Sequence, residues 1–124
     1  MKRLIIAGVL LILVVATYLT SLFYITNSCE KAKSMVEQTT KVYTQKKTAE
    51  NEAKSLEDYW NKREPLLSVF VNHDRIDDIE TAISLMNVYS KIPNNELFFE
   101  CADNVNVLIH QILEDTKFTM HSIF

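Results

Sequence analysis

The N-terminal region contains the feature that most constrains this chain, because residues 4–25 form an apolar run without a single charge. The hydrocarbon core of a bilayer is about 30 Å thick, and about 20 helical residues cross it. Small hydroxyl-bearing residues interrupt the run only at Thr17, Thr20 and Ser21, and each can bond to a carbonyl one turn earlier. The run therefore predicts a membrane-spanning helix that anchors the rest of the chain.

A cleaved signal peptide is the alternative interpretation of this segment. Lys2 and Arg3 would form its basic end, and residues 4–16 would form its apolar core. However, no pair of small residues suited to cleavage follows the core, and apolar side chains resume at Leu19. We therefore favour an uncleaved anchor.

The remainder of the chain predicts one small helical domain. One glycine and two prolines among 124 residues are too few for sheets joined by tight turns. Once Lys2 and Arg3 are set aside, 11 of the 13 basic side chains and all 16 acidic ones remain, a net charge of −5. Such a domain is a poor binder of nucleic acid. We expect a transmembrane anchor over residues 1–26 and a helical bundle domain over residues 27–124.

The charges that flank the apolar run predict its orientation in the membrane. Lys2 and Arg3 precede the run, whereas Lys31 and Lys33 lie just beyond it. Positive charge near a span favours the inner side, and the basic N-terminal tip still favours an internal N-terminus. We therefore expect the domain to lie outside the cell.

The first half of the domain shows helical periodicity. Apolar or small residues recur at alternating spacings of three and four between residues 32 and 60. A polar cluster at residues 44–48 marks a possible corner, with Thr48 as the next helix cap. The pattern alone does not decide between one long helix and a hairpin. Asn27 and Glu30 have the spacing of a capping box, so a helix either restarts there or continues from the anchor.

The second half contains further helix boundaries. Pro65 should kink a helix or begin a new one. The segment 72–74 forms a corner with Asp74 as the cap, and the next helix runs to about Lys91. Residues 92–95 end that helix. These elements predict an all-α fold, with an N-terminal transmembrane helix followed by a small antiparallel bundle of three to four helices. The expected buried positions of the last two helices are Ile76, Ile79, Ile83, Met86, Tyr89, Phe98, Cys101, Val105, Leu108 and Ile112.

Several short motifs carry a resemblance to a known family. They are the basic tip and anchor, Trp60 with basic neighbours, the run 67–73 followed by Asp77 and Ile79-Glu80, and the ending 122–124. With them the chain resembles the short membrane-anchored proteins of low-GC Gram-positive bacteria catalogued as domain of unknown function four-three-six-three. The resemblance implies a single-pass helical protein with no established enzyme activity, and it favours a hairpin at residues 44–48. It implies no catalytic residues.

One constellation could bind a metal ion. His73, Asp77 and Glu80 would share a helix face, because they are spaced at i, i+4 and i+7, and metal sites in helical bundles use such spacings. The more common interpretation makes His73 a corner residue and the two acids favourable partners of a helix N-terminus. We therefore expect no metal or other cofactor, and we keep these three residues as minor metal-site candidates.

An up-and-down bundle would return the corner at His73 and the C-terminal tail to the membrane-proximal end. The same layout places Cys29 at the proximal end and Cys101 near the distal end. Helices of about 17 residues are about 25 Å long, and a disulfide needs Cα atoms within about 7 Å, so we expect these cysteines not to be bonded to each other. The layout also gathers a patch that would seal the bundle base or bind a partner: Leu67, Phe70, Val71, His73, Phe118, Met120, Ile123 and Phe124.

The sequence favours a membrane-anchored interaction or scaffolding protein without catalytic activity. Its expected partners are the lipid bilayer and another membrane protein, and a homo-oligomer is also compatible with the sequence. The first alternative is a bitopic coiled-coil component of a membrane complex of the division or lysis type, which would need residues 32–60 to form one unbroken helix. The second alternative is a metal- or ligand-binding helical module built on His73 and its acids.

Overall fold

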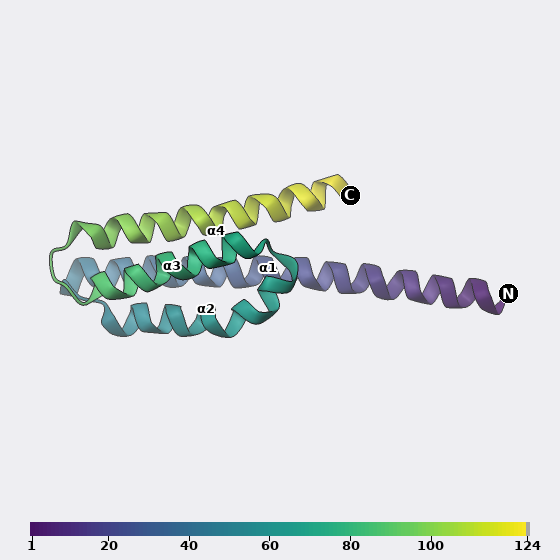
Figure 1. Cartoon of the computed structure of the whole chain (residues 1–124), viewed down its shortest axis with the longest axis horizontal. Helices are drawn as coiled ribbons and strands as arrows, with labels where there is room; N and C mark the ends of the chain where they lie inside the picture. Colours follow the sequence, from purple (N-terminus) through teal and green to yellow (C-terminus); the bar gives the residue numbers. More distant parts are fainter. Residues whose placement is uncertain (124) are drawn as a thin grey trace.

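A computed structural model describes the backbone of residues 1–123 and the side chains of residues 1–118. The chain forms four helices, α1 (Lys2–Lys46), α2 (Glu50–Phe70), α3 (His73–Ser90) and α4 (Glu96–Ile123). Each helix packs against its neighbours along the chain, and α4 also packs against α1. Figure 1 shows the resulting up-and-down bundle, from which the N-terminal part of α1 projects. The predicted all-α fold with four packed helices is thereby confirmed.

Helix α1 combines a candidate membrane span with the first helix of the bundle. Its most apolar window has a mean hydropathy of 2.5 and lies near the N-terminus. Burial begins at Ser21 and Leu22, so the end of the apolar run packs inside the bundle. The helix continues through Asn27, and no new helix starts there. One rigid element therefore carries the chain from the candidate span into the bundle core.

A hairpin separates α1 from α2 at the distal end of the bundle. Lys47 has a left-handed backbone conformation with φ 67°, and its N–H donates to the Tyr43 carbonyl at 2.8 Å. The corner within residues 44–48 is therefore present. The expected cap at Thr48 is wrong, because Ala49 precedes the first residue of α2 and no side chain caps this helix. Ala49 is buried, and its N–H donates instead to the Ser90 carbonyl at 3.0 Å.

The proximal corner between α2 and α3 begins its second helix earlier than the sequence predicts. Asn72 is the cap, because its Oδ1 accepts a hydrogen bond from the Asp74 N–H at 2.9 Å. Asp74 was expected to be the cap and lies instead in the first turn of α3. Helix α2 continues through Pro65 to Phe70, and its last turns bend across the bundle (Figure 1).

The core follows the predicted apolar stripes. Trp60 and Phe98 are its largest fully buried side chains. Three positions of the expected stripes, Tyr89, Cys101 and Leu108, are only half-buried. On α4 the predicted positions Phe98, Val105 and Ile112 are buried, but Ala102 and Ile109 are buried in place of Cys101 and Leu108.

Candidate functional site

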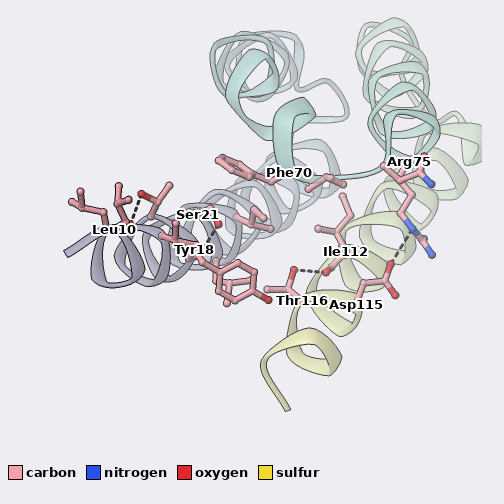
Figure 2. Close-up of a pocket in the computed structure, with 15 residues that line it drawn as sticks. Leu10, Tyr18, Ser21, Phe70, Arg75, Ile112, Asp115 and Thr116 are labelled. Atoms are coloured by element: carbon pink, nitrogen blue, oxygen red, sulfur yellow. Dashed lines mark hydrogen bonds and ion pairs between the residues drawn. The ribbon is translucent and has the colours of Figure 1, made fainter. Parts of the chain in front are cut away.

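The most distinctive surface lies at the proximal end, where the bundle meets the apolar part of α1. A groove of about 560 Å³ opens there between α1, the α2–α3 corner and α4. Figure 2 shows Phe70 over one wall and Ile112 and Thr116 on another. We call this the α4-side groove. Its lining consists of Leu10, Leu13, Val14, Thr17, Tyr18, Ser21, Leu22, Ile25, Phe70, Val71, Asn72, Arg75, Ile112, Asp115 and Thr116.

Polar groups line one part of this groove. The Arg75 Nε lies 3.0 Å from Asp115 Oδ2, and Arg75 Nη1 donates to Gln111 Oε1 at 2.6 Å. The Arg75–Asp115 pair is drawn in Figure 2. The buried hydroxyl of Tyr18 has no hydrogen-bond partner within the part of the chain that the structure describes. Such a group costs about 1–3 kcal/mol if it stays unsatisfied.

A second groove, of about 380 Å³, lies on the other side of Phe70 between α1 and α2. We call it the α2-side groove. Thr17 and Thr20 each donate a 2.8 Å hydrogen bond to a carbonyl one turn earlier, so their methyl groups contribute apolar surface. The guanidinium of Arg63 lies 5.1 Å from the centroid of the Tyr24 ring, which lines this groove. The lining consists of Leu13, Ala16, Thr17, Thr20, Ser21, Tyr24, Leu66 and Phe70.

The members of the predicted base patch differ in burial and in the groove that they line. Leu67 is fully buried in the core. Phe70 lines both grooves, whereas Val71 lines only the α4-side groove. His73 is exposed at the start of α3, and Phe118 is exposed on α4. The remaining predicted members, Met120, Ile123 and Phe124, have side chains outside the described residues.

The predicted site did not include the groove residues on α1. It also lacked the residues opposite them, Arg75, Asp115 and Thr116. A signal for the α1 wall was present, because Thr17, Thr20 and Ser21 are spaced so that they share one face of a helix. A hydroxyl-bearing face within an otherwise apolar run indicates a side that does not face only lipid.

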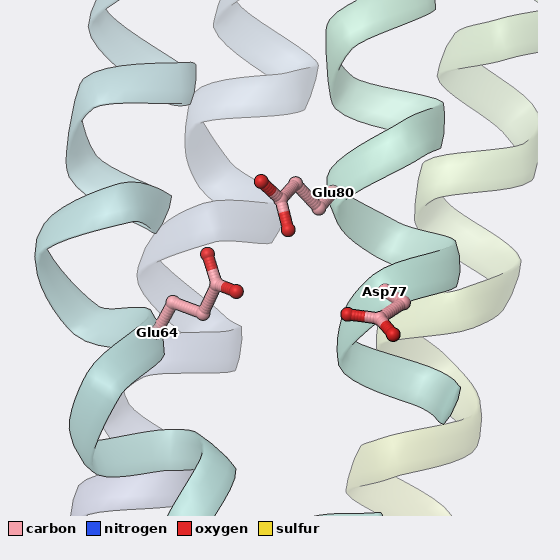
Figure 3. A group of neighbouring side chains, drawn as sticks. All are labelled: Glu64, Asp77 and Glu80. Atoms are coloured by element: carbon pink, nitrogen blue, oxygen red, sulfur yellow. The ribbon is translucent and has the colours of Figure 1, made fainter. Parts of the chain in front are cut away.

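The minor metal candidates are rearranged in the structure. Asp77 and Glu80 come together with Glu64 of α2, and the carboxylate oxygens of these three residues lie within 4.8 Å of one another. Figure 3 shows Glu64 and Glu80 directed toward each other across the two helices. His73 is not part of this group. Glu64 was not among the metal candidates predicted from the sequence. A signal was present, because Glu64 and Glu80 are equally far in sequence from the corner at Asn72. A helical hairpin places two such positions opposite each other.

One member of the acidic group, Glu64, has a raised pKa. Burial raises the pKa of Glu64, and the charge of Glu80 and a side-chain hydrogen bond to it raise this pKa further. His73 acts in the opposite direction, with a smaller effect on the Glu64 pKa. Three carboxylates offer oxygens of the type that hard divalent cations prefer, but Asp77 and Glu80 are exposed to water. Their proximity therefore does not by itself indicate a bound cation.

The two cysteines are not bonded to each other, as predicted, and both are free thiols. Burial, with a smaller effect from the charge of Glu30, raises the pKa of the Cys29 thiol to about 12. Burial followed by the charge of Glu100 also raises the pKa of Cys101. Because the thiolate is the reactive form, neither residue is activated as a nucleophile.

The fold and the site define an all-α protein in which four helices pack together and the first is a candidate membrane span. The chain belongs to the family described as "Domain of unknown function (DUF4363)", whose model matches residues 19–123. This match confirms the family resemblance seen in the sequence. It begins within the apolar run, in the same region where α1 starts to pack inside the bundle. A search of curated proteins and a search of solved structures found no match.

Proposed function

We propose that the chain is a single-pass membrane protein with an uncleaved anchor, an internal N-terminus and a bundle outside the cell. The apolar window of α1 is long enough to cross a bilayer. Leu22 and Ile25, at the end of that run, are part of the buried core. The anchor and the domain therefore share structure, which favours retention of the whole helix over its removal as a signal peptide. The basic tip Lys2-Arg3 supports the orientation.

We propose that this protein is a non-catalytic scaffold that binds a transmembrane helix of another membrane protein. The α2-side groove carries this proposal. It has two walls, α1 and α2, so a helix can approach along its open side. Ala16 and Thr20 provide the small side chains that let membrane helices pack closely. Leu66, Val69 and Phe70 extend the apolar surface at the end of α2, where they are exposed.

The coiled-coil alternative lacks its structural requirement. It needs an unbroken helix from residue 32 to residue 60, whereas the helix is interrupted between Lys46 and Glu50. Tyr43 also bonds across the bundle to the Ile92 carbonyl. The distal part of α1 therefore packs within its own chain and does not present a free seam to another one.

Site-specific photocrosslinking in membranes of the native host tests the scaffold proposal. A photoreactive amino acid replaces Val69, which lies beside the α2-side groove, and in a control chain it replaces Val88 on α3. Both positions are exposed, at 69% and 54% respectively. We expect a discrete protein adduct at Val69 that is absent at Val88. Thr20→Leu fills the groove and should abolish this adduct.

Three results would contradict the proposal. Equal adducts at the two positions would indicate nonspecific contact, and an adduct at Val69 that survives Thr20→Leu would place the partner elsewhere. An adduct with twice the mass of the chain would identify the partner as a second copy of this protein and would contradict binding of a different membrane protein.

A further inference from the structure

We infer that the α4-side groove binds an outer-leaflet phospholipid, with an acyl chain along α1 and the phosphate beside Arg75. The inference rests on the single-pass placement proposed above, but it concerns a different face from the partner groove. Val14, Leu22 and Ile25 line only the α4-side groove.

The dimensions of the groove match one leaflet of a bilayer. Its lining follows α1 from Leu10 to Ile25, a helical rise of about 22 Å. Half of the hydrocarbon core measures about 15 Å. The groove can therefore accommodate the acyl region of one leaflet and still reach the glycerol and phosphate level.

The polarity of the groove also matches that of a lipid. Leu10, Leu13 and Val14 line the end of the groove that lies farthest from the bundle, in the middle of the apolar run. The polar side chains Asn72, Arg75 and Asp115 come from the bundle itself. An acyl chain against the first set and a headgroup against the second would place each chemical group of the lipid in a matching environment.

Arg75 can hold a phosphate without losing its present partners. Its guanidinium has five N–H donors, and its contacts with Asp115 and Gln111 use only Nε and Nη1. Neither of these two contacts uses the donors on Nη2. Guanidinium groups bind phosphates through paired donors. The unpartnered hydroxyl of Tyr18 adds a donor deeper in the groove, at the level of a lipid ester.

The shape of the groove favours a lipid chain over a protein helix. Its three walls come from α1, the α2–α3 corner and α4 (Figure 2). A helix with its side chains is about 10–12 Å across, whereas a single acyl chain is thinner and flexible and can lie between three walls. Because α1 is a candidate span, the medium that surrounds the open part of the groove would be lipid.

Native mass spectrometry of the full chain tests this inference. The protein is reconstituted in vesicles of equal parts phosphatidylcholine and phosphatidylglycerol, extracted into detergent, and analysed for retained phospholipid. Val14→Trp fills the groove, and Ile12→Trp is the matched control. Both residues are similarly exposed on the apolar run, at 66% and 69%, but Ile12 lines neither groove.

We expect the wild-type chain and Ile12→Trp to retain a phospholipid and Val14→Trp to lose it. Arg75→Gln should reduce retention, because the phosphate would lose its guanidinium partner. Circular dichroism confirms that each variant keeps its helical content. Absence of retained lipid on the wild-type chain, or equal retention by Val14→Trp, would overturn the inference. The Val69 adduct is measured separately and is unaffected by Val14→Trp, so failure of one proposal is distinguishable from failure of the other.

Discussion

At the scale of single residues, Tyr43 connects the two distal corners of the bundle. Its ring stacks on Phe98 with centroids 3.9 Å apart. Its hydroxyl donates to the Ile92 carbonyl at 2.6 Å and accepts from the Asn95 N–H at 2.8 Å. The Tyr43 hydroxyl thus provides hydrogen-bond partners for the Ile92 carbonyl and the Asn95 N–H. Both groups belong to the α3–α4 connection, outside the regular helices.

Tyr43→Phe should keep the stacked ring and remove both hydrogen bonds. We expect the free energy of unfolding to fall by about 1–2 kcal/mol, which corresponds to several degrees of thermal midpoint for a domain of this size. Circular dichroism of the full chain in detergent measures this change. Tyr59→Phe is the control, because the Tyr59 ring contacts Arg63 through its face. Equal midpoints for the two variants would show that the Tyr43 hydroxyl does not hold the corners together.

Glu64 should make stability depend on pH. Its pKa is raised in the folded protein above the ordinary value of 4.5, first by burial and then by the charge of Glu80. A raised carboxyl pKa means that the folded state binds more protons than the unfolded state, so its contribution to stability is present below pH 4.5 and is lost as the pH rises through the folded pKa. The contribution of Glu64 to the thermal midpoint should therefore decrease as the pH rises above 4.5.

Glu64→Gln imitates the protonated side chain and should remove this pH-dependent contribution. The thermal midpoint at neutral pH should then exceed that of the wild-type chain, as measured by scans across a pH series. Glu57→Gln, on the same helix but outside the acidic group, controls for the loss of one charge. A lower midpoint for Glu64→Gln at neutral pH would instead indicate that the ionised group binds a cation.

At the scale of the elements, the start of α3 distinguishes two possible caps. Asn72→Ala removes the side chain that accepts from the Asp74 N–H and should destabilise the protein by about 1 kcal/mol. Asp74→Ala removes only a first-turn charge and should cost less than about half of that amount. Thermal midpoints of the two variants compare these effects. A larger decrease in thermal midpoint for Asp74→Ala than for Asn72→Ala would indicate that Asp74 is the cap, as expected from the sequence.

Helix identity followed from the sequence because the apolar spacing repeats over long segments, and the scarcity of glycine excluded most alternatives. Helix ends were less predictable, since they depend on contacts between distant corners. Ala49 is a poor cap by residue type, yet its N–H bonds to Ser90, far away in the sequence. Asn72 and Asp74 both suit a cap position, and only the backbone path between α2 and α3 selects Asn72.

The candidate site was predictable only in part, for a related reason. The sequence indicated that the corner at His73 would return to the proximal end, and Phe70 does line both grooves there. The groove itself depends on how far α4 extends along α1, which no local pattern encodes. Glu64 joins Asp77 and Glu80 only through the register of α2 against α3.

At the scale of the whole molecule, the bundle and the candidate span form one continuous structure. Helix α4 ends on the same side of the bundle from which the apolar part of α1 projects (Figure 1). Leu66 and Phe70 of α2 line a groove together with Ala16 and Thr20 from the apolar run. If that run crosses a bilayer, the end of α2 must lie at a membrane surface or within it.

The depth of Val69 in a bilayer tests this placement most directly. A nitroxide is attached at residue 69, or at residue 88 as the control, in a full chain with Cys29→Ala and Cys101→Ser, and the protein is reconstituted in vesicles. Collision rates with oxygen, which concentrates in lipid, and with a water-soluble nickel complex report the depth of each label. We predict that residue 69 favours oxygen and residue 88 favours nickel. Equal access of nickel to both labels would contradict the placement, because the bundle would then stand clear of the membrane.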